Sequence, residues 1–390
     1  MADTTSSVGY VRNVRSPWFI VDGHLDLAYN ALGWRRNYRR AARWNRAQEQ
    51  GTISAREAGQ CATGLPDLVR GRVGIVFGTV FLEPARKTMG VSPLTYGDAE
   101  DAYRLGMAQL DYYRRWAERD HHVRLIGTQQ DLNDVLETWG LYTPPPQRAT
   151  YTYTRTDTPP PCHRVGIVPL MEGADPIREP RELEGWAEQG LRIVGPAWTG
   201  TRYAGGTHEP GGLTKLGREL LDMIASLGLI LDVSHLAQQA LFDALEHFEG
   251  GPGHLIASHS NPQRIIPTDR HLPDRAIGMI AERGGVIGVV LFNKFLRKDW
   301  GAGSKKHEVT LDDVVRAIDY ICQVTGSADH VALGSDFDGG FGAESAPREL
   351  DTSRDLHRIG DELVMRGLSP QDVEKVMSGN WLRVLRTCLP

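Results

Sequence analysis

The chain has 390 residues, of which 41% are hydrophobic and 24% are charged, as is typical of a globular protein. Its formal net charge is −5 and no run of like charges forms a tail, which argues against a nucleic-acid partner. No stretch approaches the ~20 consecutive apolar residues that cross a bilayer, so no membrane-spanning segment is expected.

The N-terminus and the cysteines indicate the cellular compartment. Residues 1–17 are polar and are interpreted as an N-terminal extension, because they lack the apolar core of a signal peptide. Four cysteines stand far apart without a CxxC pair, as expected of reduced thiols and not of a disulfide frame or a Cys zinc site. They are Cys61, Cys162, Cys322 and Cys388. We therefore expect a cytoplasmic protein.

Eight apolar runs, most of them followed by a helix-like stretch, predict parallel β/α units. The runs are continuous and not alternating, as expected for strands buried on both faces. The predicted strands are Phe19–Asp22, Val73–Leu82, Val165–Met171, Leu191–Val194, Leu229–Val233, His254–Ser258, Val286–Leu291 and Val331–Gly334. A ninth run, Val123–Ile126, is short, and we place it outside the barrel. The pattern predicts an α/β fold, a (β/α)8 TIM-like barrel, as a single domain over residues 1–390.

Apolar residues near the 3.6-residue period predict the main helices. They are Asp98–Ala117, Leu216–Leu227, Gln238–Phe248, Asp274–Arg283, Leu311–Val324 and Arg354–Met365. Two segments are interpreted as surface insertions. Residues 35–60 are rich in Arg, Gln and Ala, and the arginines between Arg35 and Arg46 predict a solvated helix face near the mouth of a site. Residues 141–164 are rich in Pro and Thr and predict an extended excursion over the surface.

Acidic and imidazole side chains follow five of the predicted strands, at the end where a β/α barrel carries its active site. Each has an ordinary alternative: a lone histidine is usually structural, and Asp336 with Asp338 could form a turn before Gly339. Together they favour a metal site, because buried carboxylates are costly unless a cation compensates them. The candidate residues are His24, Asp26, Glu172, His235, His259 and Asp336.

The number of ligands predicts two metal ions. His24 and Asp26 are two residues apart in an extended segment, so they point the same way and suit one zinc-like ion. His235 and His259 suit a second ion, and Glu172 can bridge the two with its two oxygens. A mononuclear site that uses part of this set remains an alternative. In either case Asp336 is the candidate general base or proton shuttle.

At these residues the chain resembles the renal or membrane dipeptidase family, a group of binuclear zinc peptidases with an amidohydrolase-like barrel. The resemblance runs from about Phe19 to Val384, and its motifs occur in the family's order. They are Val21–Asp26, Leu170–Asp175, Gly212–Arg218, Leu231–His235, Ala257–Ser260, Leu272–Asp274, Gly284–Gly288, Gly334–Gly339 and Gly379–Asn380.

The resemblance implies a distorted barrel of the metallo-dependent hydrolase type, and a homodimer. It implies that two zinc ions bind the five ligands proposed above, with Glu172 bridging and Asp336 as the acid/base residue. It also implies that Arg270 grips the terminal carboxylate of the substrate, which suits the bidentate geometry of a guanidinium. A solvated loop arginine is the ordinary alternative.

The chain departs from the family pattern at two positions that face the substrate. Trp198 stands where the family usually has a histidine that steadies the substrate carbonyl oxygen, and an indole N–H can donate only one hydrogen bond. His208 could replace that histidine, or could be an ordinary surface residue. Phe292 stands where relatives have a tyrosine. These departures bear on substrate identity more than on metal binding.

The sequence leaves three functions open. The first is a zinc dipeptidase in which a metal-bound hydroxide attacks the peptide carbonyl; the resemblance implies that such a site can accept a C-terminal D-residue. The second is a related binuclear amidohydrolase that acts on N-acyl amino acids, lactones or cyclic amides. The third is a non-catalytic metal-binding barrel, which Trp198 favours and the complete ligand set opposes.

Overall fold

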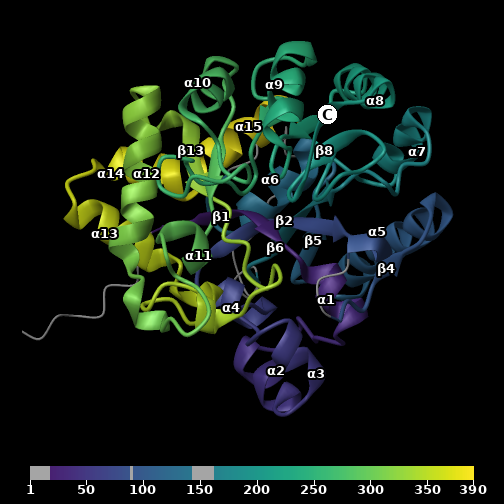
Figure 1. Ribbon diagram of the computed structural model, residues 1–390. Helices are drawn as coiled ribbons and strands as arrows, with labels where there is room; N and C mark the ends of the chain where they lie inside the picture. The colour runs from purple at the N-terminus through teal and green to yellow at the C-terminus, as the bar shows by residue number, and fades with distance from the viewer. Residues whose placement is uncertain (1–17, 88–90, 143–161) are drawn as a thin grey trace, which may run out of the picture.

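A parallel β-barrel surrounded by helices forms the centre of the computed structural model, which describes residues 18–87, 91–142 and 162–390 (Figure 1). Around the barrel the hydrogen-bonded order is β11-β10-β7-β6-β2-β1-β13-β12. A parallel bridge between Ala257 and Ile287 joins the two ends of this path, so the barrel is nearly closed. The strands are β1 (Ile20–Leu25), β2 (Val73–Phe81), β6 (Val165–Glu172), β7 (Ile193–Gly195), β10 (Ile230–Asp232), β11 (Leu255–Ile256), β12 (Ile287–Val289) and β13 (Val331–Leu333). The predicted TIM-like barrel of eight parallel strands is confirmed.

The ninth predicted strand forms and lies off the barrel, as expected. β5 (Val123–Leu125) pairs with the start of β6, where Val123 lies opposite Val165. β7 pairs with the end of β6 instead, where Leu170 lies opposite Ile193. The long strand β6 therefore pairs with β2 along one edge, while its other edge is divided between the outer strand β5 at its start and the barrel strand β7 at its end.

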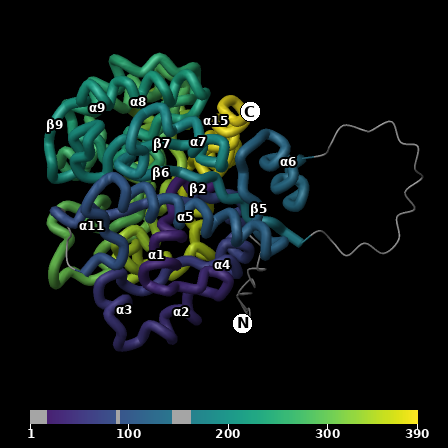
Figure 2. Tube along the Cα trace, turned by 90° about the vertical axis from the view of Figure 1, so that its right-hand side faces the viewer, coloured from purple at the N-terminus to yellow at the C-terminus, as the bar shows by residue number. Residues whose placement is uncertain are grey.

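Helices cover the outside of the barrel (Figures 1 and 2). The six predicted helices form within three residues of the expected ends. α5 starts after Asp98, whose side chain accepts a hydrogen bond from the Asp101 N–H. The helices are α1 (Leu27–Gly33), α2 (Ala42–Glu49), α3 (Ile53–Glu57), α4 (Leu65–Arg70), α5 (Ala99–Arg119), α6 (Gln129–Thr138), α7 (Leu183–Glu188), α8 (Lys215–Ser226), α9 (Gln238–His247), α10 (Asp274–Glu282), α11 (Asn293–Leu296), α12 (Leu311–Thr325), α13 (His357–Met365), α14 (Pro370–Glu374) and α15 (Asn380–Cys388). Within the described ranges, none is long and apolar enough to span a bilayer.

Two short two-stranded sheets lie beyond the ends of the barrel strands. β3 (Glu83–Pro84) pairs in parallel with β4 (Thr95–Tyr96). β8 (Ala204–Gly206) pairs antiparallel with β9 (Glu209–Leu213). Both follow barrel strands, β2 and β7 respectively, so they stand at the end where the predicted site residues lie.

The opposite end of the barrel is closed by α15. Trp381 of this helix is buried, packs edge-on against Phe77 of β2 at 5.0 Å, and donates a hydrogen bond to the Leu333 carbonyl. Asn380 donates to the carbonyls of Ala328 and Val331. Apolar side chains and satisfied backbone groups therefore fill this end of the barrel in the described part of the chain.

The arginine-rich insertion differs from its prediction. It forms α2 and α3, but its arginines are not one solvated face. Arg36 is buried and forms ion pairs with Glu49 at 2.9 Å and Asp338 at 3.2 Å. The prediction was wrong for this residue because one acidic partner, Asp338, comes from a distant part of the chain, and the other, Glu49, lies 13 positions away, which is not a helical spacing. The extension at 1–17 and most of the second insertion (143–161) lie outside the described residues.

Candidate metal centre

The structure brings all five predicted ligands and Asp336 together at the carboxyl end of the barrel. Glu172 lies in the middle. Its Oε1 is 3.0 Å from His235 Nε2 and 3.3 Å from His259 Nε2. Its Oε2 is 3.5 Å from His24 Nε2. The two carboxylate oxygens of Glu172 thus face different imidazoles, which is the arrangement that a bridging ligand requires.

The remaining two acids lie beside His24. Its Nε2 atom is 3.9 Å from Asp26 Oδ1 and 3.9 Å from Asp336 Oδ1. Three overlapping sets have ligand atoms within 4.8 Å of one another, each of a size that could hold an ion. The sets are His24–Asp26–Glu172, Glu172–His235–His259 and His24–His259–Asp336.

Two of these side chains are positioned by backbone that few residues adopt. His235 has φ of 67° and Asp336 has φ of 59°, in the left-handed region. Such residues cost roughly 1–3 kcal/mol each and persist where the surrounding structure holds them, often at functional sites. Part of that support for Asp336 comes from its own N–H, which donates to the His24 carbonyl.

A buried serine determines which nitrogen of two imidazoles carries hydrogen. Ser258 Oγ donates its only proton to Asp232 Oδ2 at 2.5 Å. The same oxygen lies 2.8 Å from His259 Nδ1 and 3.3 Å from His24 Nδ1, so it must accept hydrogen bonds from both. In the neutral rings, Nε2 of His24 and of His259 is then left with a bare lone pair that faces Glu172. This is the tautomer that binds metal through Nε2.

Similar hydroxyl contacts orient two other ligands. Thr207 Oγ1 lies 2.9 Å from His235 Nδ1. Thr79 donates a short hydrogen bond to Asp26. Ser258, Asp232, Thr207 and Thr79 were not singled out from the sequence as supporting residues. The only local signal is the serine directly before His259, because the other contacts join different strands.

The cluster lacks positive charge, which tests whether a metal fits. His235 Nε2 and His259 Nε2 are only 2.8 Å apart, and two bare lone pairs at that distance repel unless a cation or proton lies between them. His24 Nε2 is buried and has no hydrogen-bond partner among the described residues. These imidazoles and the carboxylates match the ligand chemistry of zinc. The residues present therefore fit a divalent metal.

Burial and the charges of neighbouring ligands shift the pKa values of the residues at the centre. Burial raises the pKa of Asp26 to about 7 and raises that of Asp336 well above its usual range. Burial disfavours a charged His24, yet the neighbouring carboxylates, Glu172 foremost, outweigh it and raise the pKa of His24 to about 10. Burial also lowers the pKa of His235 to about 4 and that of His259 well below its usual range, so these two imidazoles are held neutral, the form that binds a metal.

A cavity of about 300 Å³ opens above the centre. Arg270 lines it from the loop between β11 and α10 and is itself buried. Its Nη1 donates to Ser260 Oγ at 3.0 Å and its Nη2 donates to the His259 carbonyl at 2.7 Å. Its buried Nε has no partner among the described residues. The arginine is thus fixed beside the centre, and its Nε–H is available to a ligand in the cavity.

The residues at the two departures from the family pattern also line the cavity. Trp198 follows β7 and packs edge-on against Phe81 at 5.0 Å, and its indole N–H has no partner in the described part of the chain. Phe292 stacks on Phe341 at 4.5 Å. His208 is exposed at the turn between β8 and β9 and also lines this cavity.

Asp338 does not join the centre. Its carboxylate accepts hydrogen bonds from the Tyr38 hydroxyl at 2.9 Å and the Ala62 N–H at 2.6 Å, and pairs with Arg36. Only Asp336 of the two aspartates therefore faces the metal ligands. Asp338 instead attaches the loop after β13 to the insertion at 35–60.

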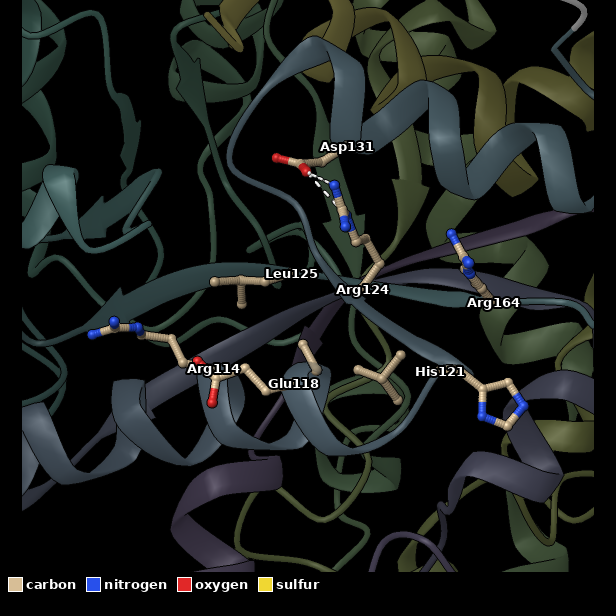
Figure 3. A pocket seen from close by; sticks show the side chains of 9 residues that line it. Arg114, Glu118, His121, Arg124, Leu125, Asp131 and Arg164 are labelled. Atoms are coloured by element: carbon tan, nitrogen blue, oxygen red, sulfur yellow. Dashed lines mark hydrogen bonds and ion pairs between the residues drawn. The ribbon is translucent and has the colours of Figure 1, made fainter.

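A different cavity, of about 390 Å³, lies on the outer side of the barrel against α5 and β5 (Figure 3). It is lined by basic side chains such as Arg114 and Arg164, and by Arg124, which is paired with Asp131 at 2.7 Å. A further group of possible ligands, His121, His122 and Cys162, precedes β5 and β6. None of the predicted site residues lines this cavity.

Comparisons with known proteins identify the family of the chain. A family model described as membrane dipeptidase (peptidase family M19) matches residues 148–388. An uncharacterised protein in the pqqA 5′ region of Klebsiella pneumoniae is 35% identical over 232 residues, which cover 57% of this chain and 82% of that protein. Dipeptidase aclJ of Aspergillus oryzae is 26% identical over 339 residues, covering 82% of this chain and 68% of that protein. Dipeptidase tcpJ of Claviceps purpurea is 30% identical over 175 residues, covering 45% of this chain and 38% of that protein.

Solved structures share the fold. The dipeptidase AC, a metallopeptidase of family M19, superposes with a TM-score of 0.73 at 24% identity, covering 95% of this chain and 99% of that one. A metallopeptidase from Rhodobacter sphaeroides, liganded with a phosphinate mimic of L-Ala-D-Ala, gives a TM-score of 0.72 at 23% identity, covering 95% and 99%.

Proposed function

The chain belongs to the membrane dipeptidase family, peptidase family M19, and is a metallo-dipeptidase, and we propose that it works with two zinc ions on free dipeptides. One ion would be held by His24, Asp26 and Glu172. The other would be held by His235, His259 and the second oxygen of Glu172. The observation that carries this proposal is that the two oxygens of Glu172 face separate imidazoles. When bound, the ions supply Lewis-acid chemistry that polarises a carbonyl and acidifies water.

Asp336 moves the proton in this scheme. Burial raises the pKa of Asp336 well above its usual range, which favours the protonated form that the second step needs, and the residue lines the cavity beside the ligands. It takes the proton from the attacking water and passes it to the leaving amine nitrogen, as a general base and then a general acid. A cleaved peptide bond requires both transfers.

Arg270 and Trp198 orient the substrate. The guanidinium of Arg270 would hold the terminal carboxylate through N–H groups that its protein partners leave free. The unpartnered indole N–H of Trp198 would donate to the oxygen of the scissile carbonyl, in place of the histidine usual in the family. The cavity of about 300 Å³ is at the small end for ligand sites, which suits a dipeptide better than a longer peptide.

We also propose that the site accepts a C-terminal D-residue. The related Rhodobacter sphaeroides metallopeptidase supports this proposal, because its structure holds a phosphinate mimic of L-Ala-D-Ala. A homodimer is a further proposal from the family resemblance. Light scattering of the purified chain in solution tests it, and a mass of one chain would contradict it.

A substrate panel tests the proposed function. Zinc-loaded protein is assayed with L,L- and L,D-dipeptides, tripeptides and N-acyl amino acids. We expect turnover of dipeptides, little turnover of tripeptides, and loss of turnover in Asp336→Asn without loss of bound zinc. Hydrolysis of N-acyl amino acids in preference to dipeptides would favour the alternative amidohydrolase. Bound zinc with no hydrolysis of any member would favour a non-catalytic barrel.

A further inference from the structure

We propose that Glu83 binds the free α-ammonium group of the substrate, on the side of the cavity opposite Arg270. This inference rests on the dipeptidase function proposed above and adds a second charged contact to it. Glu83 comes two residues after the end of β2, at the start of the short strand β3, and lines the same cavity as Arg270.

The order of strands in the barrel separates the two charges. β2 and β11 are four strands apart in either direction around the eight-stranded ring, so they stand across the barrel from each other. Glu83 follows β2, and Arg270 lies in the loop that follows β11. A substrate between them would cross the barrel axis, where Glu172 and its histidines lie.

One carboxylate oxygen of Glu83 lacks a hydrogen-bond donor in the described part of the chain. Its Oε2 is buried and has no hydrogen-bond partner among the described residues. Burial raises the pKa of Glu83, although a hydrogen bond from Ser92 lowers it. A buried carboxylate oxygen without a donor is costly. An ammonium group in the cavity would supply both the hydrogen bond and the counter-charge.

Tyr29 and Arg86, which lie near Glu83, are hydrogen-bonded to other residues. The Tyr29 hydroxyl is hydrogen-bonded to Ser92 Oγ at 2.8 Å. Arg86, the basic residue three positions further on, donates to the Gly200 carbonyl and to Glu209 at 3.0 Å. The rings of Tyr29 and Phe81, 5.0 Å apart, line the same cavity as Glu83.

The two charges together define a class of substrate. A free dipeptide is a zwitterion, with an ammonium at one end and a carboxylate at the other. An N-acyl amino acid keeps the carboxylate but has no ammonium, and a lactone has neither. A cavity with Glu83 on one side and Arg270 on the other therefore selects free dipeptides over the substrates of the alternative amidohydrolase.

The test compares two substrates that differ only in the ammonium group: L-Ala-L-Ala and N-propionyl-L-alanine. kcat/KM is measured for both with the zinc-loaded wild type and with Glu83→Gln, which keeps the size of the side chain. Glu57→Gln is the matched control, because Glu57 is an exposed carboxylate at the edge of the same cavity. We expect Glu83→Gln to lower kcat/KM for L-Ala-L-Ala by about 10- to 100-fold, mainly through KM, since one charge-assisted contact is lost. The value for N-propionyl-L-alanine, and both values for Glu57→Gln, should change less than about 3-fold.

The outcomes separate this inference from the function on which it rests. If the wild type prefers L-Ala-L-Ala but Glu83→Gln keeps the same ratio between the two substrates, Glu83 does not bind the ammonium group and the dipeptidase function stands. An equal loss on both substrates, or an equal effect of Glu57→Gln, also overturns the inference. If the wild type prefers N-propionyl-L-alanine, or cleaves neither compound, the proposed function and the inference both fail.

Discussion

Replacing Arg270 with methionine tests how the site recognises a terminal carboxylate. The side chain is only 7% exposed, and its guanidinium is fixed by Ser260 and the His259 carbonyl. Methionine fills part of the space but leaves the substrate carboxylate buried without a cation. Losing one partner of a buried, hydrogen-bonded charge pair costs about 2–4 kcal/mol, so kcat/KM for a dipeptide should fall by ~30- to 1,000-fold.

The assay pairs each dipeptide with its C-terminal amide, which has no carboxylate to lose. Arg270→Met should change kcat/KM for the amide by less than about 5-fold, because that substrate never made the ion pair. Bound zinc, measured on the same sample, should be unchanged. An equal loss for dipeptide and amide would refute the reasoning. It would mean that Arg270 acts by holding the backbone of the ligand His259 and not by binding substrate.

Three further changes test other parts of the account. Trp198→Phe keeps an aromatic ring and removes the indole N–H, so kcat should fall ~100- to 1,000-fold with KM nearly unchanged; an unaltered kcat would exclude the indole as a donor to the carbonyl oxygen. Arg36→Met should lower the free energy of unfolding by about 3–5 kcal/mol in a denaturant titration, because it leaves Asp338 without its buried cation. The exposed pair of Arg43 is the control, and Arg43→Ala should leave stability nearly unchanged; equal effects would contradict the burial argument. Zinc affinity of the metal-free protein should fall with pH and should fall more steeply below 7, because the pKa of His24, raised to about 10, lets one proton compete throughout, and that of Asp26, raised to about 7, adds a second. Calorimetry across this range measures it, and a dependence that does not steepen below pH 7 would contradict the assignment of Asp26.

The barrel strands could be predicted because strands that are buried on both faces consist mainly of apolar residues. All six residues of β1 and all nine of β2 are buried, so each strand reads as a continuous apolar run with few polar interruptions. The polar exceptions near the strand ends, such as His24 and Glu172, are then conspicuous. That contrast is why the ligand positions could be proposed before any distances were known.

Residues whose contacts join distant parts of the chain could not be identified from the sequence pattern. Tyr38 and Asp338 are 300 positions apart, yet one donates a hydrogen bond to the other. Asp232 ends β10 and Ser258 follows the neighbouring strand β11, and only their hydrogen bond shows that the serine proton is already used. Glu83 is one acid among many in the sequence, and only the order of strands around the barrel brings it opposite Arg270.

The ends of helices were harder to predict than the helices themselves, because they depend on local capping interactions. The predicted helix Arg354–Met365 begins as α13 only at His357. A capping box between Thr352 and Asp355 starts a single 3₁₀ turn first, and the chain then turns into the α-helix. The periodicity of apolar residues continues through both, so it could not separate them.

The central claim is a two-metal centre that Glu172 bridges in a dipeptidase. Its most direct test is a titration of metal-free protein with zinc, in which bound zinc per chain and hydrolysis of a dipeptide are followed on the same samples. The account predicts two zinc ions per chain, with turnover complete only when both are bound, and Glu172→Gln losing both zinc and activity. Full turnover at one zinc per chain would contradict the bridged centre, and protein that binds no zinc would contradict the metal site itself.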